Sequence, residues 1–274
     1  MTTTNTPTAT TTRSSDGTEI ARFVSGEGPP LVLVHGVLGD HTRWDVLRPH
    51  LEPRFAVHAM DRRGRGASGD GPAYAVEREF EDIAAVVDAV ASATGAPVDV
   101  YGHSGGASFA LGAAQLTTNL RRLVLYEPAL DPVALLPEGL LERVDARLAA
   151  GAPDAVVEMF CREVLQMDDD AVAAYRAQPS WDARVAAAHT LPRELRIPPE
   201  RLVDRRLVTQ VSVPVLLFQG TETPDGFKVA LSDLAAALPN ARVVDLEGQG
   251  HTADVLAPEL IAAELAAFLG ESTR

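Results

Sequence analysis

The sequence predicts an α/β fold in which helices cover both faces of a mainly parallel sheet. Strand and helix patterns alternate from Thr18 onward, which is typical of parallel strands joined by crossover helices. Several strands are continuous apolar runs, such as residues 31–34, and such runs indicate strands buried on both faces. The chain has 274 residues, of which 46% are hydrophobic, enough to bury one large core.

The elements follow in a regular order along the chain. Strands are expected at residues 19–24, 31–34, 56–60, 98–101, 123–126, 213–218 and 241–246. Helices are expected at residues 77–94, 107–115, 227–238 and 258–269. Gly95 is expected to end the first of these helices. Residues 132–208 lack strand signals, and their Ala-, Leu- and Arg-rich stretches, broken by prolines, predict several helices.

This order divides the chain into a tail, a core and a cap. Residues 1–15 are mostly threonine and lack the apolar run of a signal peptide, so we expect a disordered tail. Residues 16–131 and 209–274 are expected to form the α/β core. Residues 132–208 are expected to form a helical cap, because an insertion at the carboxyl end of a strand can roof a ligand site.

Composition and charge exclude several classes of protein. The formal net charge is -14, which repels nucleic acid and anionic membrane surfaces. No stretch approaches the roughly 18 apolar residues of a membrane span. The single cysteine, Cys161, excludes an internal disulfide and a cysteine-based metal site. We therefore expect a cytoplasmic protein that acts on a small molecule, without a nucleic-acid or membrane partner.

Residues 98–107, V-D-V-Y-G-H-S-G-G-A, carry the most specific motif. Ser104 lies between a strand and a helix, with a glycine two positions before it and another two after it, as in a nucleophile elbow. Such a turn holds Ser104 in a strained backbone conformation, and a Cβ at position 102 or 106 would collide with the neighbouring chain. The N–H group of Gly105 then points to where an oxyanion would form.

Four features, in their order along the chain, resemble the α/β-hydrolase fold family. They are His35-Gly36 after the third strand, the Ser104 elbow, an acid after a later strand, and Gly250-His251 after the last strand. The resemblance covers nearly the whole chain from about Thr18. It implies a mostly parallel eight-stranded sheet with helices on both faces, a helical cap insertion and a serine hydrolase.

The serine hydroxyl needs a base and the base needs a carboxylate. His251 is the candidate base, because the histidine of the family lies at this place. In the commonest family arrangement an aspartate stands three residues after the glycine that ends the penultimate strand, but this chain has Thr223 there. Glu127, which ends the strand after the elbow helix, is the preferred acid, since some family members carry theirs there. Glu222 and Asp225 remain alternatives.

Further residues are expected around the substrate. The backbone N–H groups of Val37 and Gly105 are the expected oxyanion hole. His103 and Leu38 are expected to contact the substrate. Trp181, in the predicted cap, is expected to offer an apolar surface to the substrate, with the alternative that it joins the cap helices to each other.

These residues predict hydrolysis of a carboxylic ester or lactone through an acyl-enzyme. The segment around Trp181 and the loop at residues 220–224 are loosely similar to zearalenone-type lactonases, so the expected substrate is an apolar ester or lactone. The same side chains also suit a thioesterase, a C–C bond hydrolase or a perhydrolase. Another alternative is a ligand receptor on this fold that hydrolyses little. No cofactor or metal is expected, because His-x-x-x-His pairs, cysteine clusters and phosphate-loop spacings are absent.

Residues 61–69, D-R-R-G-R-G-A-S-G, place three arginines among glycines. One interpretation is a phosphate cradle. The preferred interpretation is a tight turn pinned by Asp61, with the arginines solvated or paired with nearby acids.

Overall fold

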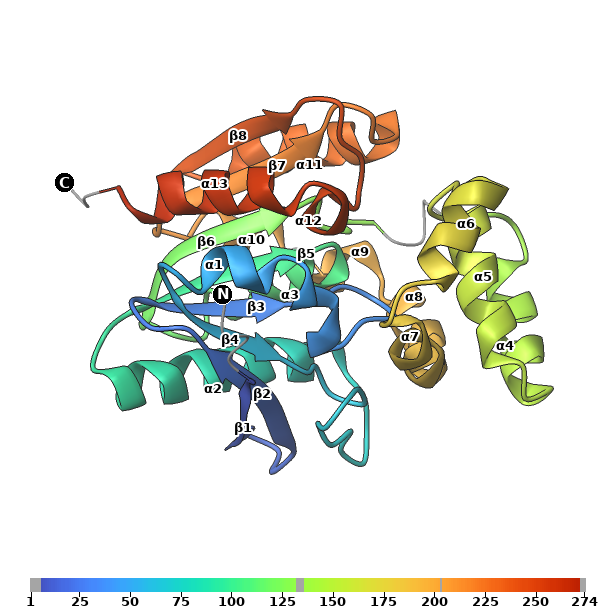
Figure 1. The fold of residues 1–274 in the computed structure, drawn as a ribbon, viewed down its shortest axis with the longest axis horizontal. Coiled ribbons are helices and arrows are strands. Elements are labelled where there is room, and N and C mark those ends of the chain that lie inside the picture. The colour runs from blue at the N-terminus through green and yellow to red at the C-terminus, as the bar shows by residue number, and fades with distance from the viewer. Residues whose placement is uncertain (1–5, 132–135, 203, 272–274) are drawn as a thin grey trace.

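The computed structural model describes residues 6–131, 136–202 and 204–271. Within these ranges one sheet has eight strands in the order β1-β2-β4-β3-β5-β6-β7-β8 (Figure 1). The strands are β1 (Thr8–Arg13), β2 (Glu19–Ser25), β3 (Pro30–Val34), β4 (Ala56–Met60), β5 (Val98–His103), β6 (Leu120–Tyr126), β7 (Val215–Gly220) and β8 (Ala241–Leu246). The β1–β2 and β2–β4 pairs are antiparallel and the others are parallel. The predicted mostly parallel sheet is confirmed.

Helices cover both faces of this sheet (Figure 1). On one face, α2 (Val76–Thr94), α3 (Gly105–Ala113) and α11 (Asp225–Ala237) pack on strand residues such as Val32. On the other face, the 3-10 helix η1 (His41–Asp45), α1 (Arg48–Leu51) and α13 (Pro258–Leu269) pack on residues such as Leu33. Because side chains alternate along a strand, β3 contributes to both cores. A left-handed Gly95 ends α2, as predicted.

The segment between β6 and β7 forms helices and no strand in its described part. The helices are α4 (Leu140–Ala149), α5 (Pro153–Glu163), α6 (Asp169–Arg176), α7 (Trp181–Ala187), the 3-10 turn η3 (Ala188–Thr190), α8 (Leu191–Leu195), α9 (Pro199–Leu202) and α10 (Arg205–Val208). Helices α4 to α8 gather at one end of the sheet, on the right of Figure 1. They enclose an apolar cluster of their own, which also contains Leu38 from the loop after β3.

The predicted disordered tail is wrong for part of residues 1–15. Thr8–Arg13 forms β1, an edge strand whose register runs from Thr8 opposite Val24 to Arg13 opposite Glu19. Threonine is β-branched and favours strands, and the free edge of β2 offers unpaired backbone groups. A threonine-rich segment beside such an edge therefore adds a strand to the sheet. Residues 1–5 lie outside the described residues.

The three arginines of residues 61–69 are buried and paired with acids. The ion pairs are Arg62–Glu79, Arg63–Asp82, Arg63–Asp16, Arg62–Glu194, Arg65–Glu79 and Arg65–Glu194. Asp61 accepts hydrogen bonds from the N–H groups of His41 and Ala67, which pins the turn. The prediction of pairing with acids is confirmed, whereas the alternative that the arginines are solvated is wrong.

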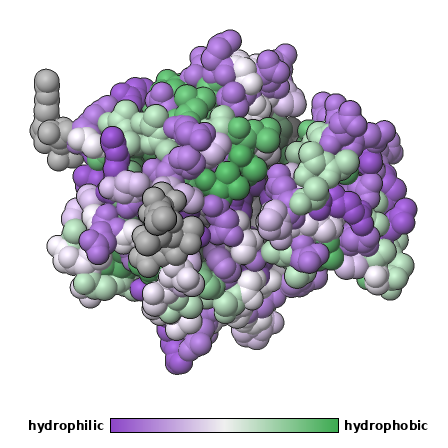
Figure 2. Space-filling model, in the orientation of Figure 1, coloured by the Kyte–Doolittle hydropathy of each residue, from purple (hydrophilic) through white to green (hydrophobic). Residues whose placement is uncertain are grey.

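The outer surface is largely hydrophilic in the face that Figure 2 shows. A hydrophobic area lies around α12 (Ala253–Leu256), where Leu256 is 75% exposed. In the described ranges, every helix is too short or too polar to cross a bilayer.

Candidate active site

Ser104 lies at the turn between β5 and α3, where the sequence predicts an elbow. Its φ and ψ of 55° and -127° are unfavourable for a residue with a side chain. A Cβ on Gly102 would lie 2.7 Å from the Cα atom of Ala107, and a Cβ on Gly106 would lie 2.5 Å from the carbonyl oxygen of Val34. The two glycines therefore allow α3 to pack directly on the ends of β3 and β5.

A buried carboxylate holds the imidazole of His251. The Nδ1 atom of His251 lies 2.5 Å from Oε2 of Glu127, which is 2% exposed. The other oxygen, Oε1, accepts hydrogen bonds from the N–H of Gly220 at 2.7 Å and from the hydroxyl of Thr223 at 2.6 Å. With Nδ1 donating to the carboxylate, Nε2 of His251 is left to accept a proton.

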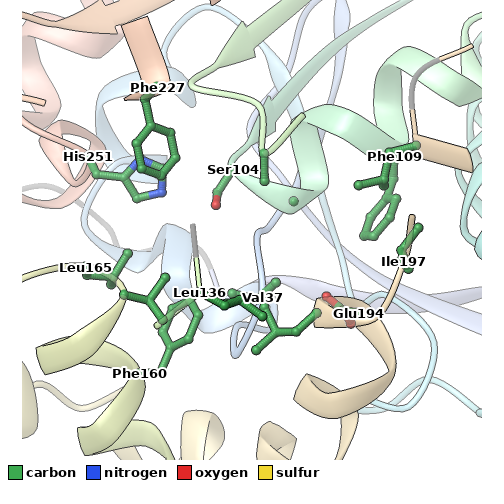
Figure 3. Close-up of a pocket in the computed structure, with 15 residues that line it drawn as sticks. Val37, Ser104, Phe109, Leu136, Phe160, Leu165, Glu194, Ile197, Phe227 and His251 are labelled. Atoms are coloured by element: carbon green, nitrogen blue, oxygen red, sulfur yellow. The ribbon is translucent and has the colours of Figure 1, made fainter. Parts of the chain in front are cut away.

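The serine and the histidine face each other. Figure 3 shows the hydroxyl of Ser104 and the ring of His251 pointing toward one another. Both residues line the same pocket. Of the three predicted acids, the structure brings Glu127 to His251, whereas Glu222 and Asp225 are exposed and Asp225 lies 3.4 Å from Lys228.

Two backbone donors lie beside Ser104. The N atom of Val37 lies 3.8 Å from the position that a Cβ on Gly105 would occupy. Among the hydrogen bonds of the described residues, neither the N–H group of Val37 nor that of Gly105 donates to a protein acceptor. Gly36 brings this loop close, because a Cβ there would lie 2.9 Å from the Cβ of Ser104. The two N–H groups are therefore available to an oxygen of a bound substrate.

The pocket has two lobes that share Val37, Ser104, Phe160, Leu165 and His251. The apolar lobe encloses about 540 Å³ including its mouth, and its side chains include Phe109, Leu136, Val164, Leu195, Ile197 and Phe227 (Figure 3). The polar lobe spans about 400 Å³ including the space at its mouth that is open to solvent, and its lining includes Arg43, His103, Cys161, Tyr175, Arg184 and Thr252. Helix α5 borders both lobes, so the segment between β6 and β7 walls the pocket.

The predicted substrate contacts divide into two groups. His103 and Leu38 line the polar lobe. Trp181 lines neither lobe and is 7% exposed within the apolar cluster of helices α4 to α8. The guanidinium of Arg176 lies 5.1 Å from its ring. Its place among these helices favours the alternative that Trp181 joins them to each other, and its contact with the substrate stays a prediction.

His103 supports the loop that carries His251. Its Nε2 atom lies 2.8 Å from the carbonyl oxygen of His251, to which it can donate. Burial, together with Arg43 and His251, holds the pKa of His103 well below its ordinary value, so the ring is neutral. Arg43, whose Nη2 atom lies 3.3 Å from Nε2 of His103, makes two hydrogen bonds to Asp254, at 2.8 Å and 2.7 Å. These contacts fix the start of α12 beside the pocket.

Sequence reasoning missed several residues that hold or line this site. The hydroxyl of Tyr126 bonds to the carbonyl oxygen of Gly250 and accepts the N–H of Ala253 at 3.1 Å, so it braces the chain on both sides of His251. Thr223 occupies the position that holds the acid in the commonest family arrangement. This position in the sequence could have indicated that its side chain lies near His251. Arg184 carries no such signal in the sequence.

Comparisons with known proteins agree with this architecture. A family model described as "Alpha/beta hydrolase family" matches residues 31–264. A solved alpha/beta hydrolase from Sphaerobacter thermophilus is 39% identical, with a TM-score of 0.81, and the match covers 95% of this chain and 100% of that one. The 2-(acetamidomethylene)succinate hydrolase of Mesorhizobium japonicum is 26% identical over 263 residues, 89% of each chain. The N-formylmaleamate deformylase of Pseudomonas putida is 36% identical, but over only 107 residues, 38% of each chain.

Proposed function

The chain belongs to the alpha/beta hydrolase family, and on this premise we propose that it is a serine hydrolase that cleaves a carboxylic ester or amide through an acyl-enzyme. One observation carries the proposal. A serine on a strained elbow faces an imidazole whose second ring nitrogen lies 2.5 Å from the buried carboxylate of Glu127. This is the arrangement by which a weak hydroxyl nucleophile is activated at neutral pH.

Each residue has a defined part in the proposed reaction. Ser104 attacks the carbonyl carbon while His251 accepts its proton, and Glu127 stabilises the imidazolium that results. The N–H groups of Val37 and Gly105 donate to the oxyanion of the tetrahedral intermediate. His251 then protonates the leaving group. A water molecule activated by His251 hydrolyses the acyl-enzyme and restores the hydroxyl of Ser104.

The bond that is cleaved is a C–O or a C–N bond of an acyl group. Acyl-enzyme chemistry is the same for esters, for lactones, which are cyclic esters, and for amides. The names of two relatives, 2-(acetamidomethylene)succinate hydrolase and N-formylmaleamate deformylase, refer to amide-type substrates, which supports including amides. The apolar lobe, next to Ser104, suits an apolar part of the substrate.

A fluorophosphonate probe tests the nucleophile directly, because it reacts with serine hydroxyls that are activated by a base. We expect rapid labelling of the wild-type protein on the peptide that contains Ser104, measured by mass spectrometry. Labelling is expected to disappear in Ser104→Ala. Ser108→Ala is the matched control, because Ser108 is a buried serine of α3, the helix that follows Ser104, and its hydroxyl donates to the carbonyl oxygen of Ala129.

Labelling that persists in Ser104→Ala would place the reactive residue elsewhere. A wild-type protein that stays unlabelled would contradict the hydrolase and favour a ligand receptor on the same fold.

A further inference from the structure

Within the part of the chain that the structure describes, Arg184 is a buried cation without an anionic partner. It lies on α7, is 2% exposed and lines the polar lobe together with Ser104 and His251. Its guanidinium carbon lies 4.1 Å from the ring centre of Tyr175, and its Nη2 donates to the hydroxyl of Ser180 at 3.3 Å. No ion pair joins it to a carboxylate of the described residues, and its buried Nε has no hydrogen-bond acceptor there.

Several other buried arginines of the described residues are paired with carboxylates. Arg122 and Arg22 lack a carboxylate partner, as Arg184 does, but of these three only Arg184 lines the pocket. Arg62 and Arg63 bind carboxylates at 2.8 Å and 2.7 Å, and Arg43 binds Asp254 at 2.7 Å. A charge that is removed from water is costly unless an opposite charge and hydrogen bonds replace the lost hydration. Burial lowers the pKa of the Arg184 guanidinium, as expected for a cation in this position. Its environment therefore favours an anion from outside the chain.

The side chains around the polar lobe carry one positive charge that no negative charge of the lobe compensates. Arg43 faces the lobe, but Asp254 already balances its charge. His103 is neutral, and among the described residues the lining of the lobe includes no aspartate or glutamate. The cationic charge of Arg184 is therefore unbalanced next to the nucleophile.

We propose that the polar lobe binds a carboxylate of the substrate and that Arg184 is its partner. The substrate is then an ester or amide that carries a free carboxylate near the scissile carbonyl group. A guanidinium presents parallel N–H donors that match the two oxygens of a carboxylate, and one unpaired arginine matches a single negative charge. The apolar lobe holds the remainder of the molecule. This inference rests on the proposed function, because it orients a substrate in the same site.

Two esters that differ mainly in charge test the proposal. Monomethyl succinate carries a carboxylate, and methyl succinamate carries a neutral amide of similar size in its place. We expect the wild-type kcat/KM, measured by methanol release, to be about 10- to 100-fold higher for monomethyl succinate, as for a charged hydrogen bond. Arg184→Met is expected to abolish this preference and to retain the rate on methyl succinamate within a few-fold.

Two further variants separate charge from packing. Arg176→Met is the matched control, because Arg176 also stacks on an aromatic ring of these helices but does not line either lobe. It is expected to keep the preference for the carboxylate. Arg184→Lys keeps the charge with a different donor geometry, so a reduced preference for the carboxylate is expected. This variant replaces Arg184→Met in the test if Arg184→Met does not fold.

A binding measurement does not depend on turnover. By calorimetry, Ser104→Ala is expected to bind monomethyl succinate at least about tenfold more tightly than methyl succinamate. The same difference is expected to vanish when Arg184→Met is added. Equal affinities and rates for the two esters, or a preference that survives Arg184→Met, would overturn the carboxylate site. In that case, labelling of Ser104 by the fluorophosphonate would still support the proposed hydrolase. Conversely, binding that depends on Arg184 in a protein that the fluorophosphonate does not label would support the carboxylate site and contradict the hydrolase.

Discussion

At the scale of single residues, Glu127 is the most constrained side chain of the site. One carboxylate oxygen contacts His251, and the other accepts hydrogen bonds from Gly220 and Thr223. Its backbone has a φ of 43°, which is uncommon for a residue with a side chain. The carboxylate therefore has one orientation, and this orientation determines which ring nitrogen of His251 faces Ser104.

Replacing Glu127 by glutamine is expected to lower kcat about 1000-fold or more while the protein stays folded. The amide keeps the size of the side chain but no longer stabilises the imidazolium that forms when Ser104 attacks. Turnover of an ester substrate in a pH-stat, with circular dichroism to verify folding, measures the effect. Glu222→Gln and Asp225→Asn are the matched controls, because both side chains are exposed, and they are expected to retain near-normal rates. Near-normal turnover in Glu127→Gln would assign the role to another acid.

At the scale of the elements, backbone strain gathers at the carboxyl ends of neighbouring strands. Leu38, Ser104 and Glu127 have positive φ values and follow β3, β5 and β6. Such conformations cost free energy and persist only where the surrounding structure enforces them. The strands β3, β5 and β6 are neighbours in the sheet, so the three strained positions lie along the edge that carries the pocket.

Strand β4 contains a buried histidine, His58, whose protonation is disfavoured in the folded protein. Both ring nitrogens lack a hydrogen-bond partner among the described residues, and the side chain lies near Arg22 of β2. Burial, with a smaller effect of Arg22, lowers the pKa of His58 to about 4. Between pH 6.5 and pH 4 the unfolded chain therefore binds a proton that the folded protein does not bind.

Acidification is expected to destabilise the protein through His58. Since the unfolded state gains the proton, this histidine contributes stability at neutral pH that is lost as the pH falls below about 6.5. From pH 7 to pH 5 the wild-type free energy of unfolding is expected to fall about 2 kcal/mol further than that of His58→Leu, which has no titrating group. Urea titrations at the two pH values measure both changes. Parallel losses in the two proteins would contradict this role of His58.

At the scale of the whole molecule, buried ion pairs join the helical segment between β6 and β7 to the sheet. Glu194 of α8 contacts Arg62 and Arg65, which follow β4, and these arginines also contact Glu79 of α2. Glu194 additionally lines the apolar lobe. The position of α8 over the pocket is therefore tied to the turn after β4 by charges that are shielded from water.

Breaking this connection is expected to destabilise the protein strongly. Glu194→Gln leaves Arg65 with weaker compensation of its buried charge, and the expected cost is about 3 kcal/mol or more. Thermal unfolding is expected to shift down by roughly 10 °C, as this free energy implies for a chain of this size. Asp145→Asn is the control, because its ion pair with Arg196 is exposed and is worth less than about 1 kcal/mol. Equal shifts in the two variants would show that the buried pairs do not hold α8.

Much of the fold follows from patterns that are local in the sequence. The ranges of β4 and β8 agree with their predicted bounds, and the Ser104 elbow lies where the glycines predict it. Alternating hydrophobicity, helix-stop glycines and turn motifs depend on neighbouring residues, so they are readable without the structure. The order of the motifs was sufficient to indicate the family.

The tertiary structure decided what depends on contacts between distant residues. It pairs His251 with Glu127 rather than with Glu222 or Asp225, although all three candidates lie near ends of neighbouring strands. It adds residues 8–13 to the sheet, because an edge strand needs the partner that β2 provides. It brings Arg184 into the same lobe as Ser104, with no carboxylate partner among the described residues. Pairing, burial and compensation of charge are properties of packed surfaces, and the linear order of residues does not specify which surfaces meet.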